Sequence, residues 1–171
     1  MIDLEANTVA DDAVGKLSLR PLREEDLPTM FEIQFDDEAQ HLAAFVGETA
    51  RDRDAYLKRW REFLKDEEIG TKVIELDGEI VGSVGTFPIE GDIELTYWIR
   101  KDVWGRGVAT KAVAALLEDF TARPLHARVV EDNLGSVRVL EHNGFVRIGS
   151  EDSFAEGRQA TVTELIYVLS E

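Results

Sequence analysis

The chain has 171 residues, 44% of them hydrophobic and none of them cysteine, with a formal net charge of −16. This length and composition predict one domain, and the lack of cysteine excludes disulfides, zinc–thiolate sites and a cysteinyl acyl-enzyme. The negative charge argues against nucleic acid or an anionic membrane as partner and favours a cationic ligand such as an amine, unless the acidic surface only maintains solubility. No metal-ligand cluster is evident, and we expect no metal.

Residues 1–16 are polar and acidic and have no hydrophobic period, so we expect a mobile tail. They lack the basic start and apolar core of a secretory signal. No stretch of the chain reaches the ~18 consecutive apolar residues of a membrane helix. We therefore expect a cytoplasmic protein with a single domain at residues 17–171.

The first third of the chain alternates between strand and helix patterns. Residues 17–22 read as a short strand, and residues 23–36 as a helix whose first turn is acidic. Residues 37–50 carry no pattern and predict a loop. A second helix is expected at about 51–67, where an apolar stripe indicates a core-facing side.

The clearest local signal is a β-hairpin. Two strand-like runs, 72–76 and 79–87, flank Asp77-Gly78, which is a favoured two-residue turn. We expect Pro88 to end the second strand, because proline cannot donate to a ladder. The next run, 92–100, alternates in the way expected of a strand covered, at least partly, on both sides.

A glycine-punctuated turn follows that strand. Gly105 and Gly107 leave the backbone open to a close ligand, and a helix expected from about Arg106 points its free N–H groups toward the turn. With the helix dipole and the donors of Thr110 and Lys111, this predicts a phosphate or pyrophosphate site. Four basic residues between Arg100 and Lys111 against one acid, Asp102, make the region locally positive. The alternative is a turn with no ligand.

The C-terminal third continues the mixed pattern. A long amphipathic helix from about residue 108 ends before Pro124, and residues 125–130 read as a buried strand. Asn133 is a candidate N-cap for a helix through His142, and Asn143-Gly144 a candidate stop. Two strands, 145–149 and 160–169, follow with an acidic loop between them. The element order is mixed α/β.

Two sequence blocks resemble the GNAT N-acetyltransferases. The run YWIRKDVWGRGVAT ends in a turn similar to their acyl-CoA pyrophosphate loop, Gln/Arg-x-x-Gly-x-Gly/Ala: Gly107 and Ala109 match, whereas Trp104 departs at the first position. The run EDNLGSVRVLEHNGF is similar to the Asn-x-x-Ser-x-x-x-Leu-x-x-x-Gly-Phe signature of the branch with ribosomal-protein N-terminal (RimJ/RimL-type) acetyltransferases. The resemblance extends more loosely from about residue 17 to the C-terminus.

The resemblance implies a mixed central sheet of about six to seven strands flanked by about four helices, with a V-shaped splay between two central strands. Unpaired backbone groups in that splay would bind the pantetheine arm of acetyl-CoA, since buried amides require partners. The pyrophosphate would lie on the glycine turn, and two polar residues of the second block would flank the thioester. The implied cofactor-binding residues are Trp98, Ile99, Arg100, Gly105, Arg106, Gly107, Val108, Ala109, Thr110, Asn133 and Ser136.

Transfer to an amine requires a base for its proton and an acid for the leaving thiolate. Glu94 is the candidate base or water-positioning residue, because burial in a sheet raises the pKa of a carboxylate; the alternative is a strand-end carboxylate in water. Ser136, or less favourably Tyr97, is the candidate acid, although Ser136 could serve only as a cap. An amide near Ile99 would stabilise the thioester oxygen.

The sequence thus predicts an acetyl-CoA-dependent N-acetyltransferase that transfers acetyl directly to a primary amine, either a protein N-terminal α-amine or a small molecule. The branch resemblance also raises the possibility of a homodimer. A catalytically silent acyl-CoA-binding module is the alternative. A nucleotide or phosphosugar binder using the same helix terminus is a third reading.

Overall fold

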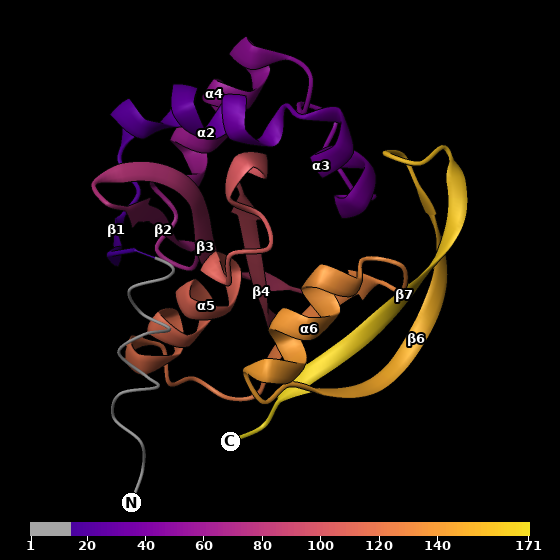
Figure 1. Ribbon diagram of the computed structural model, residues 1–171. Helices are drawn as coiled ribbons and strands as arrows, with labels where there is room; N and C mark the ends of the chain where they lie inside the picture. Colours follow the sequence, from indigo (N-terminus) through magenta and orange to yellow (C-terminus); the bar gives the residue numbers. More distant parts are fainter. Residues whose placement is uncertain (1–14) are drawn as a thin grey trace, which may run out of the picture.

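The computed structural model describes residues 15–171, so nearly all of the tail predicted for residues 1–16 lies outside the described range. The fold is a seven-stranded mixed sheet in the order β1-β2-β3-β4-β5-β7-β6 (Figure 1). The strands are β1 Leu17–Pro21, β2 Gly70–Leu76, β3 Glu79–Ile89, β4 Asp92–Ile99, β5 Leu125–Val130, β6 Val146–Ala155 and β7 Ala160–Leu169.

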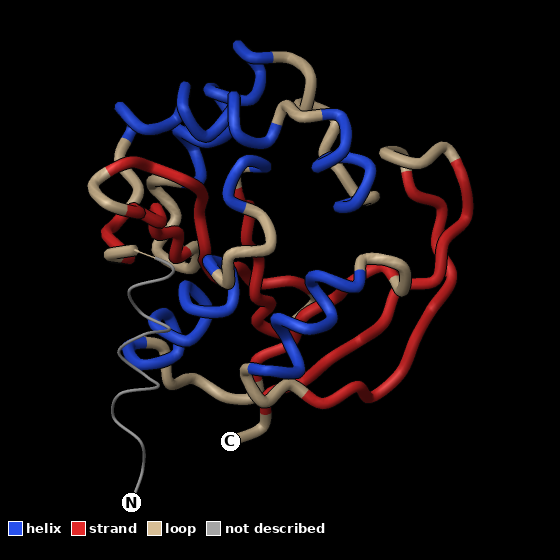
Figure 2. The backbone as a smooth tube through the Cα atoms, viewed as in Figure 1, coloured by secondary structure: helices blue, strands red, loops and turns tan. Residues whose placement is uncertain are grey.

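Two groups of helices pack on this sheet (Figure 2). The α-helices are α2 Leu27–Gln34, α3 Asp37–Ala43, α4 Arg53–Phe63, α5 Val108–Asp119 and α6 Leu134–His142; the 3-10 turns are η1 Glu24–Asp26 and η2 Lys101–Val103. The larger core lies between the sheet and α5 and α6, and the smaller core joins α2 and α4 to the other face. None of the helices in residues 15–171 is both long and apolar enough to cross a membrane.

The first four strands form a continuous antiparallel sheet. In the predicted hairpin, Asp77 has φ 52° and Gly78 has φ 83°, the two positive values that a type I′ turn requires. The prediction that Pro88 ends β3 is wrong: Pro88 pairs with Ile93, and β3 continues to Ile89. The pairing of β2 with β3 stops at Thr86, so no strand on that side requires an N–H from Pro88.

The two halves of the sheet meet at a single ladder pair. β4 and β5 run parallel, and their only paired residues are Glu94 and His126. Beyond that pair the strands separate, whereas β5 pairs with β7 along its whole length. This is the V-shaped splay that the sequence predicts, and the predicted fold class is confirmed.

Three local predictions need correction. Residues 37–50 contain a helix, α3, which is capped by Asp36 Oδ1 accepting from Ala39 N at 2.9 Å. Helix α5 begins at Val108 and not at Arg106. The strand predicted to end at Gly149 continues as β6 to Ala155, because β7 pairs with its polar second half.

Candidate active site

Alternate residues of β4 point their main-chain N–H and C=O groups away from β3 and toward the splay. Arg100 N donates to Val81 O at 2.7 Å, which makes residues 100 and 81 a hydrogen-bonded antiparallel pair. Such pairs alternate along a ladder, so Trp98 also bonds toward β3, and the main chains of Tyr97 and Ile99 point to the opposite side. Trp104 Nε1 donates to Ile99 O at 2.8 Å. The main chain of Tyr97 and the N–H of Ile99 therefore face the splay, where β5 offers no ladder partner.

This geometry distinguishes among Trp98, Ile99 and Arg100, the three residues of β4 and its end that were predicted to bind the pantetheine arm. The amides of Trp98 and Arg100 are used within the sheet, and Ile99 is the member whose amide faces the splay. Two acids hold the Arg100 guanidinium: Asp102 at 2.6 and 2.9 Å and Glu79 at 2.6 Å. A backbone contact to a pantetheine arm thus fits Tyr97 and Ile99 better than Arg100.

The predicted positive region is less positive than its sequence indicates. Arg100 is paired with carboxylates of β3 and η2, and Lys101 Nζ lies 2.7 Å from Glu38 Oε2 of α3. Acidic residues distant in the sequence therefore neutralise two of its four cations. The fit for a phosphate depends more on backbone N–H groups than on net charge.

Those backbone groups lie at the start of α5. Gly105 and Gly107 have φ 75° and 77°, a left-handed conformation that favours glycine, and Gly107 is the N-cap. No side chain of the described residues caps this end, and the first intrahelical bond runs from Lys111 N to Gly107 O at 3.1 Å. The N–H groups of the first turn, residues 108–110, are left for an anion. Arg106 lies in the turn itself, between the two glycines.

The second sequence block places its polar residues beside β4. Asn133 Oδ1 accepts from Ser136 N at 3.3 Å, which confirms the predicted N-cap of α6. Ser136 also has a side-chain partner, because Tyr97 Oη lies 2.9 Å from Ser136 Oγ. Burial raises the pKa of Tyr97 to about 12, and the hydrogen bond to Ser136 offsets part of this effect. The two candidate acids therefore form one hydrogen-bonded pair, in which Tyr97 stays protonated at neutral pH.

Glu94 lies on the opposite face of β4 from Tyr97, because the two positions differ by an odd number. Glu94 is only 6% exposed, so the alternative of a strand-end carboxylate in water is wrong. Its Oε1 accepts from Arg128 Nε at 2.9 Å. The candidate base and the candidate acids thus flank the splay from its two sides.

Arg128 is the residue at this site that the sequence interpretation missed. It occupies an alternating position in β5 among the buried residues Ala127, Val129 and Val130. Arg128 is the exposed member of this strand, so the sequence pattern alone makes it an ordinary solvent-facing charge; the buried partner that requires it is Glu94. Nothing in the sequence pattern links Glu94 to Arg128.

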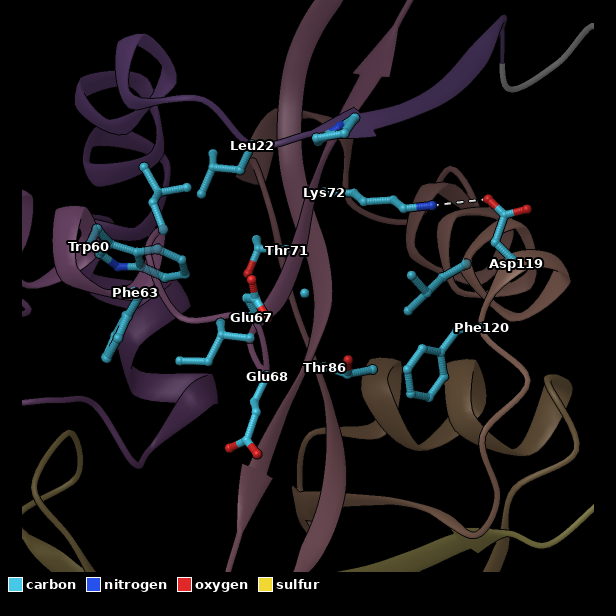
Figure 3. A pocket seen from close by; sticks show the side chains of 15 residues that line it. Leu22, Trp60, Phe63, Glu67, Glu68, Thr71, Lys72, Thr86, Asp119 and Phe120 are labelled. Carbon is cyan, nitrogen blue, oxygen red and sulfur yellow. Dashed lines mark hydrogen bonds and ion pairs between the residues drawn. The ribbon is translucent and has the colours of Figure 1, made fainter.

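Two surface concavities lie outside this arrangement. One, of about 500 Å³, lies between the ends of α4 and α5, with Trp60 and Phe63 on one wall, Phe120 on the other and the Lys72–Asp119 ion pair at 3.0 Å (Figure 3). It contains none of the predicted site residues. The second, of about 710 Å³, is lined partly by α2 and by η2, and Arg100 is one of its residues.

A splayed mixed sheet with a glycine turn opening a helix defines an α/β enzyme of the acyltransferase class. A family model described as an acetyltransferase (GNAT) domain matches residues 16–146. This match covers most of the chain, and the protein belongs to the GNAT acetyltransferase family, whose members are N-acetyltransferases. No curated protein matches the chain.

Solved structures agree with this assignment. Mycobacterium smegmatis RimJ, in complex with CoA-disulfide, is 27% identical over 92% of this chain and 83% of its own, with a TM-score of 0.76. The ribosomal-protein-alanine N-acetyltransferase of Brucella melitensis is 22% identical over 90% of this chain and 99% of its own, at a TM-score of 0.75. Salmonella typhimurium yncA, a putative acetyltransferase solved with its cofactor acetyl-CoA, is 18% identical over 90% of this chain and 93% of its own, with a TM-score of 0.73. The last two show similarity of fold alone.

Proposed function

We propose that this protein binds acetyl-CoA in the splay between β4 and β5 and acetylates the N-terminal α-amine of a protein or peptide. The observation that carries the proposal is the single Glu94–His126 ladder pair, with Glu94 on one face of the opening and the Tyr97–Ser136 pair on the other. The similarity to M. smegmatis RimJ, solved in complex with CoA-disulfide, supports the cofactor. The choice of acceptor rests on the resemblance of the second sequence block to the ribosomal-protein N-terminal acetyltransferases. A small-molecule amine is the other acceptor compatible with the family.

The residues present fit the cofactor in three places. The main chains of Tyr97 and Ile99 would hold the pantetheine arm, because they face the splay without a partner on β5. The first turn of α5 and its N-cap Gly107 would hold the pyrophosphate. Asn133 and Ser136, at the start of α6, would flank the thioester end. When bound, acetyl-CoA supplies an activated acyl group.

The protein's own residues would then carry out two proton transfers, one from the acceptor amine and one to the departing thiolate. Glu94, directly or through water, would take a proton from the acceptor, because an α-amine with a pKa near ~8 is largely protonated at neutral pH. Ser136 Oγ would give a proton to the departing sulfur, and Tyr97 Oη, 2.9 Å from it, would stabilise the hydroxyl in that task. The N–H of Ile99 would donate to the carbonyl oxygen under attack.

The deciding experiment is turnover of acetyl-CoA, read by thiol release, with peptides that begin in alanine or serine and with spermidine as the small amine. We expect turnover with a peptide and loss of acetyl-CoA binding, measured by calorimetry, in Gly107→Glu. Binding without turnover on any acceptor would favour the silent module. Absence of binding by the folded protein would contradict the proposal. A homodimer and a cytoplasmic location stay predictions.

A further inference from the structure

Arg128 bridges the splay at its narrow end. It lies on β5 two residues beyond His126, the last residue paired with β4, and its Nε reaches back to Glu94 Oε1 at 2.9 Å. No backbone bond joins the two strands at this level. The guanidinium therefore connects β4 and β5 where the sheet itself no longer does.

Two further carboxylates hold the other end of this guanidinium. Arg128 Nη1 donates to Glu151 Oε1 of β6 at 2.6 Å and lies 4.0 Å from Glu164 Oε2 of β7. Glu151 and Glu164 are cross-strand partners in the β6–β7 ladder. The arginine is thus anchored from the C-terminal half of the sheet while it contacts the candidate base on the N-terminal half.

The contact with Glu94 is selective for one oxygen. Only Oε1 of Glu94 accepts from Arg128, and the carboxylate has no other hydrogen-bond partner among residues 15–171. A carboxylate fixed by one oxygen has a defined orientation, and its second oxygen remains able to accept a proton. The guanidinium also provides the opposite charge that a carboxylate with 8% side-chain exposure requires.

We propose that Arg128 is a positioning residue for the acetyl transfer: it fixes Oε1 of Glu94 so that Oε2 faces the acceptor amine, and Glu151 and Glu164 hold it in place from the β6–β7 hairpin. This inference rests on the proposed function, in which Glu94 is the base. It adds a residue that acts through Glu94 and does not itself contact substrate. It also makes the hairpin a support for catalysis.

A double-mutant cycle tests this role. On the peptide acceptor, Glu94→Gln is expected to lower kcat/KM about 100-fold, and Arg128→Met about tenfold or more, mainly through kcat. Because Arg128 acts through Glu94, adding Arg128→Met to Glu94→Gln should cost less than about twofold more. Arg128→Lys, which keeps one donor and the charge, should recover part of the loss.

The matched control is Arg61→Met. Arg61 also donates through Nε to one carboxylate, Glu24, at 2.8 Å, but both partners are exposed. Its loss should leave kcat/KM unchanged within about twofold and show that removing an arginine ion pair is not enough. Additive losses in the cycle, with Arg128→Met equally harmful without Glu94, would overturn the positioning role.

A second readout requires no acceptor. The Nε–H signal of Arg128 in ¹H–¹⁵N spectra, identified by its loss in Arg128→Lys, should exchange slowly with solvent and exchange at least tenfold faster in Glu94→Gln. An unchanged signal in Glu94→Gln, together with faster exchange in Glu151→Gln, would show that the hairpin alone holds Arg128 and would overturn the inference. Failure of the wild type to turn over any acceptor would instead contradict the proposed function, so the two failures are distinguishable.

Discussion

Two arginines in this protein each gather carboxylates from distant parts of the chain, and they do so with different results. Arg20, on β1, donates through Nε to Glu75 at 2.7 Å and through both terminal nitrogens to Asp26 at 2.8 and 2.9 Å. Arg128, on β5, has three carboxylates around it, and the third, Glu164, is no closer than 4.0 Å. In the Arg20 cluster, which we call closed, both carboxylates accept hydrogen bonds from the arginine. In the Arg128 cluster, which we call open, Glu164 lies too far from the guanidinium to accept one.

The pKa values of buried Asp26 and partly buried Glu164 shift in opposite directions because of this difference. The hydrogen bond from Arg20 lowers the pKa of Asp26, despite burial that acts to raise it. Burial raises the pKa of Glu164, and the attraction of Arg128 is too weak at its distance to reverse the effect. A closed ion pair stabilises the fold. Around Arg128, beside the splay, the carboxylates outnumber the single guanidinium, an arrangement that favours a cationic acceptor.

Removing Arg20 from the Arg20–Asp26–Glu75 cluster should have the largest effect on stability and none on activity. Arg20→Met leaves Asp26, 4% exposed, without its only charged hydrogen-bond partner among the described residues, and should lower the free energy of unfolding by about 3 kcal/mol in urea titrations. Arg61→Met, in an exposed pair, should cost less than about 1 kcal/mol. A loss of kcat/KM by folded Arg20→Met would show that the two clusters are not separate in function.

The same cluster should give the protein its acid sensitivity. Because the folded pKa of Asp26 lies below the ordinary value of 3.8, its contribution to stability is present above pH 3.8 and is lost as pH falls through the folded pKa. Asp26→Asn should flatten the decline of unfolding free energy in that acidic range. An unchanged slope in this variant would assign acid sensitivity to other carboxylates.

Breaking the pair of candidate acids should have an intermediate effect, on activity. Removing one hydroxyl of the Tyr97–Ser136 pair, by Ser136→Ala or Tyr97→Phe, should lower kcat about fivefold or more, because each change removes a hydrogen bond worth about 1 kcal/mol. Ser136→Ala should be the more harmful of the two. Equal activity of Ser136→Ala and wild type would limit Ser136 to a structural place in the first turn of α6, where Asn133 caps its N–H, and would favour a water as the proton donor.

The smallest effect should come from replacing Glu164, and this change should stabilise the fold. The raised pKa of Glu164 means that its ionisation costs free energy in the folded state, so stability declines as pH rises above the ordinary value of 4.5. Glu164→Gln should therefore raise the free energy of unfolding by up to about 1 kcal/mol at neutral pH, with no gain below pH 4.5. Destabilisation at neutral pH would show that Glu164 is a needed partner of Arg128.

Elements with local signals could be predicted from the sequence. Asp77-Gly78 fixes its hairpin because both residues tolerate positive φ, and Asn133 fixes the start of α6 by capping Ser136 N. The splay followed from the family resemblance, which rested on the two short blocks. Glycine and cap positions are informative because their conformational requirements are met within a few residues.

Features that depend on distant partners could not be predicted. Arg128 and Glu94 are separated by 34 positions and meet only because β4 and β5 are neighbours in the sheet. The positive charge expected around Arg100 was overestimated, because Glu79 and Glu38 arrive from other elements. Helix α3 has no apolar period and is held instead by its contacts, including Gly157 N to Ala44 O at 2.8 Å.

The most direct test of the account is residue-resolved amide hydrogen exchange with and without coenzyme A. We predict that coenzyme A slows exchange at Tyr97, Ile99 and the first turn of α5, whereas Trp98 and Arg100, already bonded to β3, change little. Protection confined to other surfaces, such as the concavity between α4 and α5, with no change at Tyr97 and Ile99, would contradict the placement of the cofactor in the splay.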